Sequence, residues 1–252
     1  MVAMKKHLLI TAVLFCASGS LFAQTPDTTR LSADEIMATV FAKDSVRETM
    51  GAGYTGKREY MLENHKMNKR AEMQVSVAGD PDGTKHFEVV SEDGWKPAHK
   101  HVFRKMLESE IETSLPNSRS KTRLVPENYQ FNLLGYEYRE GRPVYIIEAL
   151  PKRNDKYLFR GRICVDAQDY AVARIEGEPA KNASFWIHST HFVAQYQRSG
   201  PFWYPTSTTS VTEARVFGTT EVNIHYFDYR PVAGYPKQQT NSFPVEAHYV
   251  QH

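Results

Sequence analysis

Alternation of apolar and polar residues is clearest in the stretch NKRAEMQVSVAG. There, Met73, Val75 and Val77 alternate with polar side chains, which is the period of a strand with one buried face. The flanking stretches 54–64 and 85–94 also have strand-like composition, and the segment GDPDG carries strong turn residues. Together the three stretches predict an antiparallel meander.

Two other stretches have the period of an amphipathic helix. The first, SADEIMATVFAKDSVRETM, begins with Ser32 and Glu35, which form a capping box, and ends before Gly51 and Gly53. The second begins at Pro97, a residue that suits the first helical turn, and ends at the segment LPNS. Its apolar stripe consists of Val102, Phe103, Met106, Leu107 and Ile111.

The rest of the chain consists of strand-like runs separated by short polar breaks. Hairpins at this spacing favour an antiparallel sandwich or barrel over parallel βαβ units. We therefore expect a mainly β (α+β) fold with about ten strands. The further runs are YQFNLLGYEY, PVYIIEALP, YLFRGRICV, YAVARIEG, SFWIHSTHFVAQYQ, STTSVTEARVF and TTEVNIHYFDY.

One predicted hairpin raises a question about the interior of the sheet. The runs YLFRGRICV and YAVARIEG flank the break DAQD, in which Asp166 and Asp169 suit a tight turn. Phe159, Ile163 and Val165 then share one face of the hairpin. This face belongs either to a filled core or to the wall of a cavity, and the sequence leaves both open because they need the same side chains.

The first residues of the chain have the form of a secretory signal. Lys5 and Lys6 precede the apolar run LLITAVLFCASGSLFA, which is short for a membrane span and ends in the small residue Ala23. Cys16 leaves a lipoprotein signal as an alternative, although the bulky Phe15 before it does not suit that cleavage. We expect a signal peptide at 1–23, a flexible leader at 24–31, one domain at 32–231 and a loosely structured tail at 232–252.

The charge of the chain gives no general attraction to nucleic acid. There are 31 Lys and Arg against 29 Asp and Glu, and two of the basic residues lie in the signal segment, so the remaining chain is neutral. Without that segment Cys164 is the single cysteine, and no internal disulfide can form. Alternation places Cys164 opposite Ile163 and Val165, which leaves partial exposure of its thiol open.

Candidate catalytic and metal-binding residues form no recognisable constellation. His99 and His101 are two positions apart on the predicted helix, and His188 and His191 are three apart on a predicted strand, so the members of each pair point in different directions. The carboxylates of the second helix fit a solvated face. No GxSxG, HExxH, phosphate-loop or CxxC motif is present. We therefore expect neither an enzyme nor a metal or other cofactor.

Aromatic residues are dense in two late runs, SFWIHSTHF and GPFWYP. Such residues supply large apolar surfaces, which suit a filled β core and the wall of an apolar cavity equally well. They are Phe185, Trp186, Phe192, Phe202, Trp203 and Tyr204.

Several ordered runs carry a resemblance that covers nearly all of the chain after the signal segment. They are EYMLENHKMNKRAEM, GTKHFEVVSEDGW, HVFRKMLESE, PENYQFNLLG, KYLFRGRICVDAQDYAVARIEGEPAKNASFW and GPFWYPTSTTSVTEARVFG. In these runs the chain resembles a bacterial family of outer-membrane lipoprotein-sorting proteins with a LolA/LolB/RseB-like fold. The resemblance implies a strongly curved, incompletely closed antiparallel β-barrel with two or three helices plugging its concave face.

The resemblance also implies a function. It suggests a periplasmic carrier that holds the acyl chains of a lipid or lipoprotein in an apolar cavity for transfer toward the outer membrane. Burial of roughly fifteen CH₂ groups gains on the order of ten kcal/mol, which suffices to draw a lipid from water. The alternative is an RseB-like envelope sensor that regulates a protein partner.

The implied partners are acyl chains, an envelope protein that donates or receives them, and a membrane in transient contact; no nucleic acid is expected, and the protein is expected to be a monomer. The apolar face of the second helix would exchange contacts between empty and loaded states. The candidate cavity and lid residues are Val102, Phe103, Met106, Leu107, Ile146, Phe159, Ile163, Val165, Trp186, Phe192, Ile224 and Tyr226.

Overall fold

The computed structural model describes residues 31–50, 53–182 and 184–232. The chain divides into two compact units, Met1–Arg30 and Leu31–His252, and every described residue belongs to the second unit. The predicted signal peptide and nearly all of the predicted leader and tail lie outside the described residues.

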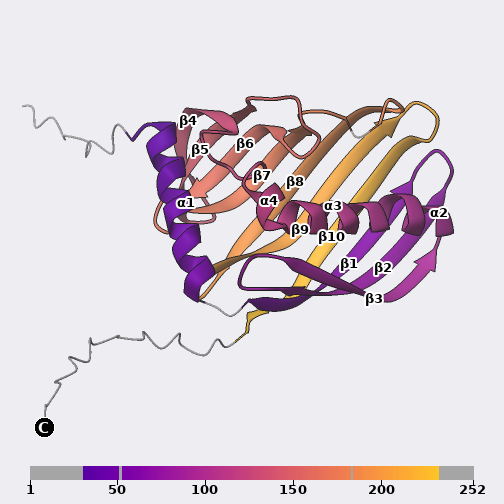
Figure 1. Cartoon of the computed structure of the whole chain (residues 1–252). Coiled ribbons are helices and arrows are strands. Elements are labelled where there is room, and N and C mark those ends of the chain that lie inside the picture. Colours follow the sequence, from indigo (N-terminus) through magenta and orange to yellow (C-terminus); the bar gives the residue numbers. More distant parts are fainter. Residues whose placement is uncertain (1–30, 51–52, 183, 233–252) are drawn as a thin grey trace, which may run out of the picture. The chain divides into compact units, whose positions relative to one another are not determined.

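One antiparallel sheet of ten strands makes up most of the described unit (Figure 1). Its order is β3-β2-β1-β10-β9-β8-β7-β6-β5-β4, so that β3 and β4 are its two edges and the sheet is not closed. This confirms the mainly β, open antiparallel fold. The strands are β1 (Tyr54–Asn64), β2 (Lys69–Gly79), β3 (Lys85–Gly94), β4 (Tyr129–Arg139), β5 (Arg142–Pro151), β6 (Phe159–Asp166), β7 (Ala171–Pro179), β8 (Ile187–Ser199), β9 (Phe202–Ala214) and β10 (Gly218–Pro231).

Pairing between β1 and β10 joins the two ends of this unit. The strands β1 to β3 form one meander and β4 to β10 form another, each with neighbours that are consecutive in sequence. The two meanders meet where β1 runs antiparallel to β10, with Tyr54 opposite Pro231 and Asn64 opposite Thr220. The sheet is therefore continuous only because the first and last strands pair.

The described helices lie in two stretches of the chain, α1 before β1 and a group between β3 and β4 (Figure 1). The helix α1 (Ala33–Met50) precedes β1, and the predicted capping box is present: Glu35 accepts from the Ser32 backbone N–H at 2.7 Å, and Ser32 Oγ accepts from the Glu35 N–H at 3.2 Å. Between the edges β3 and β4 the chain forms α2 (Lys96–Ala98), the π-helical turn η1 (His99–Phe103), α3 (Arg104–Ser114) and α4 (Pro116–Arg119). The second predicted helix is therefore present, and the π-helical turn η1 interrupts it near its start.

Each helical cover lies over its own apolar cluster. Under α1, the residues Ile36, Met37 and Val40 pack against buried side chains of β4, β5 and β6. Under η1 and α3, Phe103 and Leu107 pack against buried side chains of β1, β2 and β10. The first cluster includes Tyr129, Phe131, Ile147, Ala149, Leu158, Ile163 and Val165, and the second includes Tyr60, Leu62, Ala71, Met73, Val75, Val222 and Ile224.

The hairpin β6–β7 answers the question that its sequence left open. Ile163 and Val165 are buried in the α1 cluster and Phe159 packs at its side, so this face belongs to a filled core. Cys164 lies on the opposite face but is also buried, so the structure decides the question of thiol exposure, which the sequence left open, in favour of burial. Phe185 and Trp186 belong to neither core cluster; β8 begins at Ile187, after them, and both rings are exposed.

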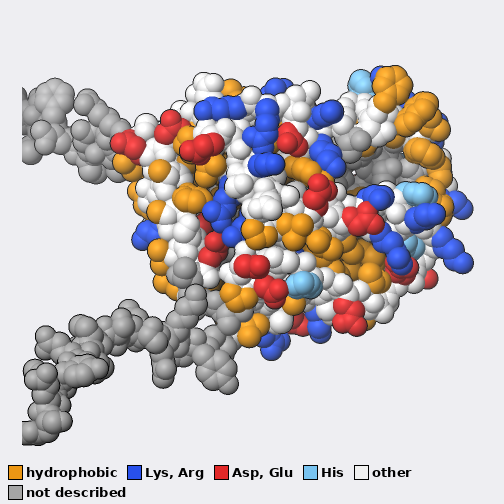
Figure 2. All heavy atoms as spheres, in the orientation of Figure 1, with side chains coloured by type: hydrophobic (Ala, Val, Ile, Leu, Met, Phe, Trp, Pro, Cys, Tyr) orange, Lys and Arg blue, Asp and Glu red, His pale blue; other side chains and the backbone are white. Residues whose placement is uncertain are grey.

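Side chains of both charge signs are interspersed over the face that carries the helices (Figure 2). Hydrophobic side chains gather beside α3, where Ile111 and Leu115 are partly exposed. The two apolar clusters themselves are covered from solvent, which is the condition for an open sheet to be stable in water.

We expect the substitution Phe103→Ala to lower the free energy of unfolding by about 3–5 kcal/mol, because it leaves a cavity in the cluster under η1 and α3. Phe103 is fully buried, and its ring lies 5.7 Å from that of Tyr60. The control Val90→Ala removes an exposed side chain from the edge strand β3 and should change stability by no more than about 0.5 kcal/mol. Urea unfolding measures both, and equal midpoints for the two variants would contradict this view of the core.

Candidate functional site

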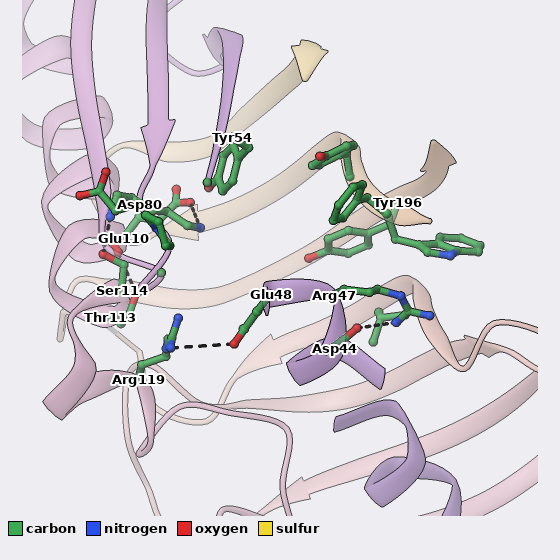
Figure 3. Close-up of a pocket in the computed structure, with 18 of the residues that line it drawn as sticks. Asp44, Arg47, Glu48, Tyr54, Asp80, Glu110, Thr113, Ser114, Arg119 and Tyr196 are labelled. Carbon is green, nitrogen blue, oxygen red and sulfur yellow. Dashed lines mark hydrogen bonds and ion pairs between the residues drawn. The ribbon is translucent and has the colours of Figure 1, made fainter. Parts of the chain in front are cut away.

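A cavity of about 470 Å³ lies on the helix-bearing side of the sheet, between α1 and the segment α3–α4 (Figure 3). Its lining comes from α1, α3 and α4, from the β2–β3 turn, and from the strands β1, β7, β8 and β9. The two apolar clusters lie under the helices, and the cavity occupies the space between them.

Aromatic rings line one side of this cavity. Tyr204 stacks on Phe202 at 5.9 Å and lies 6.4 Å from the ring of Tyr54. Behind them, Tyr229 stacks on Tyr54 at 5.6 Å and lies 5.6 Å from Tyr204. These rings form a broad apolar surface whose hydroxyl groups sit at the edges. The aromatic lining residues are Tyr54, Tyr196, Phe202, Trp203 and Tyr204.

The charged residues of the lining are all paired. Three ion pairs account for six of them: Arg47 with Asp44 at 2.7 Å, Lys85 with Glu110 at 2.7 Å, and Arg119 with Glu48 at 4.0 Å. The seventh, Asp80, lies within hydrogen-bond distance of the His86 imidazole Nε2, at 2.8 Å. Figure 3 shows Arg47 beside Asp44 and Arg119 beside Glu48 at the rim. Any group that enters the cavity therefore meets charged side chains that already have partners.

A buried guanidinium fixes α3 to the sheet. Arg58 on β1 is only 2% exposed and donates two hydrogen bonds to the carboxylate of Glu110 on α3, at 2.7 and 3.0 Å. Its Nε donates to the hydroxyl of Tyr229 at 2.8 Å. The ring centroids of Phe87 and Tyr226 each lie 4.9 Å from the Cζ atom of Arg58. A guanidinium in such a place is stable only while its hydrogen bonds are satisfied.

Glu110 joins three elements of the fold. Besides Arg58 of β1, it accepts a hydrogen bond from Lys85 Nζ on β3. Burial alone would raise the pKa of Glu110, but the ion pairs with Lys85 and Arg58 outweigh burial and lower it to about 2. In contrast to Glu110, Tyr196, on the far side of the cavity, has its pKa raised to about 12 by burial.

The opposite wall is attached through the β6–β7 turn. Asp166, which is buried, accepts hydrogen bonds from the backbone of Gln168 and Asp169 and pairs with Arg142, so the predicted turn chemistry is confirmed. Arg47 of α1 donates to the carbonyl oxygen of Asp169 at 2.5 Å. Trp203 Nε1 donates to the carboxylate of Asp169 at 3.2 Å. One turn thus positions both α1 and part of the aromatic lining.

None of the twelve predicted cavity and lid residues lines this cavity. Trp186 is exposed, Phe192 contacts the ring of Phe159 at 5.7 Å, and Ile146 lies on the opposite face of β5 from buried Ile147. The cluster under η1 and α3 holds Phe103, Leu107 and Ile224, with Val102, Met106 and Tyr226 packed against it, whereas the α1 cluster holds Ile163 and Val165, with Phe159 packed against it. Their part in ligand binding stays a prediction.

Phe202, Trp203 and Tyr204 stand out in the sequence by their aromatic density but are not among the predicted site residues. Arg58 and Tyr54 are absent from that prediction as well. For Arg58 a signal existed: in the alternation of β1 it falls on the same face as Tyr60 and Leu62, both of which are buried. A charged residue at such an inward position requires a partner.

Within the described ranges, no group of three or more His, Cys, Asp or Glu side chains is placed to hold a metal ion. His99 is buried and its Nε2 lies 2.8 Å from the carbonyl oxygen of Asp93, whereas His101 is exposed. Of the helices described, none combines the length and apolar character needed to cross a membrane.

Comparison with known proteins gives one family match. A family model described as "Family of unknown function (DUF5686)" matches residues 126–229, from just before β4 into β10, which is less than half of the chain. No curated protein is significantly similar to the sequence.

The chain is similar to several solved structures. One is a DUF1329 family protein from Desulfovibrio piger, at 12% identity, covering 82% of this chain and 96% of that chain with a TM-score of 0.44. Another is a LolA superfamily protein from Nitrosomonas europaea, at 8% identity, 82% and 96% coverage and a TM-score of 0.42. A third is an outer membrane lipoprotein-sorting protein domain from Vibrio parahaemolyticus, at 15% identity, 81% and 97% coverage and a TM-score of 0.39. The structures found thus include the family that the sequence resembles.

We expect Glu110→Gln to destabilise the protein by about 2–3 kcal/mol, because it leaves the buried charge of Arg58 without its counter-ion. Glu110 is partly exposed, which reduces the full penalty of a buried pair. The control Glu108→Gln, on the same helix, breaks only an exposed pair with Lys105 and should cost no more than about 0.5 kcal/mol. Urea unfolding at neutral pH compares the two, and equal losses would show that Glu110 does not anchor α3.

The same carboxylate predicts a pH dependence. Because folding lowers the pKa of Glu110 from 4.5 to about 2, its contribution is fully present above the unfolded value and is lost as the pH falls toward 2. The difference in unfolding free energy between the parent and Glu110→Gln should therefore be constant near neutral pH and shrink on acidification below about pH 4.5. A difference that stays constant down to about pH 3 would contradict the lowered pKa.

Proposed function

We propose that the cavity between α1 and α3–α4 binds the acyl chain of a lipid or lipoprotein, and that the protein carries it in the periplasm toward the outer membrane. The observation that supports this most is the cavity itself: about 470 Å³ of space beside an aromatic surface, on the side of the sheet that carries the helices. This volume lies in the range of about 300–1,000 Å³ that is usual for small-molecule sites.

The lining suits a chain with an uncharged polar end. The rings of Tyr54, Phe202 and Tyr204 offer an apolar surface, on which each buried CH₂ group gains about 0.8 kcal/mol. Since the charged lining residues are already paired, an ionic group would have to displace an existing partner. An ester- or amide-linked acyl chain requires no such exchange.

The ligand would enter between the helical covers and leave both in place. Lifting α3 would break the hydrogen bonds of Glu110 with Arg58 and leave a charge unpaired in an apolar setting. The contacts of Phe103 and Leu107 with the sheet would therefore persist in the loaded state. This differs from the exchange of contacts expected from the sequence.

The proposed location depends on the predicted signal peptide at 1–23. An envelope protein that supplies or receives the lipid is part of the same proposal, because an acyl chain does not cross water unassisted at a useful rate. Lipid bound during expression, extracted and identified by mass spectrometry, would name the natural ligand.

Filling the cavity should abolish acyl binding. In Thr113→Trp a large ring on α3 occupies the space beside the aromatic lining, and we expect the affinity for a fluorescent fatty-acid probe to fall at least about tenfold. The matched control Glu108→Trp places the same ring on the exposed face of α3 and should bind as the parent does. Displacement titrations with fatty acids measure both.

Two outcomes would count against the proposal. One is a parent protein that binds no acyl probe, and the other is a Thr113→Trp variant that binds it with unchanged affinity. The far-UV spectrum and urea midpoint of each variant show whether the fold is retained.

A further inference from the structure

Charge is divided between the two ends of the strands. At one end lie the turns 80–84, 140–141, 167–170 and 200–201, which contain four acidic residues and no Lys or Arg; one of the four, Asp169, pairs with Arg142 and Arg198 of the adjoining strands. At the other end lie the connections 65–68, 95–98, 152–158, 180–186 and 215–217, which we call the basic end; the segment 120–128, with Lys121, Arg123 and Glu127, leads into β4 beside them. The basic end contains a single acidic residue, Asp155, and the exposed residues Lys66, Lys96, Lys152, Arg153, Lys156, Lys181 and Arg215.

Strand pairing places these connections on one side. Asn64, at the end of β1, pairs with Thr220 near the start of β10, and Ala214, at the end of β9, pairs with Ile187 at the start of β8. The last residues of β3, β5 and β7 lie at the same end of the sheet, because each of these strands pairs there with the first residues of its antiparallel neighbour β2, β4 or β6. The division of charge is therefore a property of the folded sheet, because the chain as a whole is nearly balanced.

Four large apolar side chains project from the basic end. Phe185 is 73% exposed, Trp186 56%, Val216 53% and Phe217 50%. The first two belong to the β7–β8 connection and the other two to the β9–β10 turn, and we call them the apolar tip. Figure 2 shows hydrophobic side chains gathered at the upper right, where the β9–β10 turn lies in Figure 1.

Hydrogen bonds hold the apolar tip in position. The backbone N–H of Arg215 donates to the carbonyl oxygen of Trp186 at 2.9 Å, which joins the two connections. Lys66 Nζ donates to the carbonyl of Val216 at 3.0 Å, and Asn64 donates to that of Phe217 at 2.9 Å. The exposed rings are thus presented by a fixed framework, so their exposure does not come from a loose loop.

From this arrangement we infer that the basic end docks on an anionic lipid bilayer, with the apolar tip entering the headgroup region. Trp and Phe are favoured at the membrane–water interface, and Lys and Arg near an anionic surface are attracted to it. Insertion of apolar side chains alone, or attraction of basic residues alone, gives weak membrane binding, and the two combined give stable binding. The docking surface includes none of the residues that line the cavity.

Docking of this kind would hold the cavity away from the bilayer. The cavity is lined by Asp80, Pro81 and Gly83 of the β2–β3 turn and by Phe202 beside the β8–β9 turn, and both turns lie at the end of the strands opposite to the basic end. A membrane-bound molecule would therefore keep its acyl site open to a partner in the aqueous compartment.

Vesicle co-sedimentation tests this inference on the chain from Gln24 onward, which contains the whole unit Leu31–His252. The protein is mixed with vesicles of phosphatidylcholine alone and of phosphatidylcholine with phosphatidylglycerol. We expect binding to the anionic vesicles, a blue shift of tryptophan fluorescence, and weakening by salt. The double variant Trp186→Ser/Phe217→Ser should bind at least about tenfold more weakly.

Two further variants control for loss of apolar surface and for charge. Leu134→Ser/Tyr138→Ser removes two large side chains that are at least as exposed as Phe217, at 51% and 71%, from the edge strand β4 and should bind as the parent does. Lys152→Gln/Lys181→Gln should weaken binding by about fivefold for each charge removed. Acyl-probe binding should stay unchanged in all of them, so a failure of this inference can be told apart from a failure of the proposed carrier function.

The inference is overturned if the parent stays in the supernatant with anionic vesicles or if the Trp186→Ser/Phe217→Ser variant sediments as the parent does. The inference is also overturned if the protein does not bind vesicles and the apolar tip instead binds an envelope protein. That result would assign the surface to a protein partner.

Discussion

The hydrogen-bonded pair of Arg58 and Glu110 is the interaction on which the rest of the site depends. A guanidinium that is almost fully buried keeps its place only while a carboxylate faces it, and here the carboxylate comes from α3. This requirement fixes where α3 crosses the sheet. It thereby sets one wall of the cavity, and Arg47, through the β6–β7 turn, sets the other.

The two covers explain why an open sheet of this width has both a core and a cavity. Each helix buries a cluster of side chains on its own half of the sheet, and neither reaches across β8 and β9. The strip between them is lined by the partly buried aromatic residues Phe202, Trp203 and Tyr204 of β9, of which Tyr204 carries a hydroxyl group and Trp203 an indole N–H. Aromatic side chains tolerate this position because their faces are apolar while their rims can meet water.

Much of the fold was predictable because one local pattern repeats. Alternation identified β2 through Met73, Val75 and Val77, and turn residues separated the hairpins. The site was harder to predict, since the same aromatic and aliphatic residues serve core and cavity. Val102 and Met106 have the helical spacing expected of a helix that covers a cavity, but they pack against a filled cluster. Tyr54 lines the cavity, and nothing in the neighbouring sequence indicates this. Which surfaces remain uncovered depends on where the helices cross the sheet, and this is set by long-range contacts such as that of Arg58.

The pairing of β1 with β10 has a consequence for the time at which the chain can fold. The meander β1–β3 has an unpaired side until the last strand of the unit arrives, and contacts so distant in sequence form slowly. During synthesis β1 therefore lacks its second neighbour until β10 has been made, and the complete sheet can form only after both meanders are available.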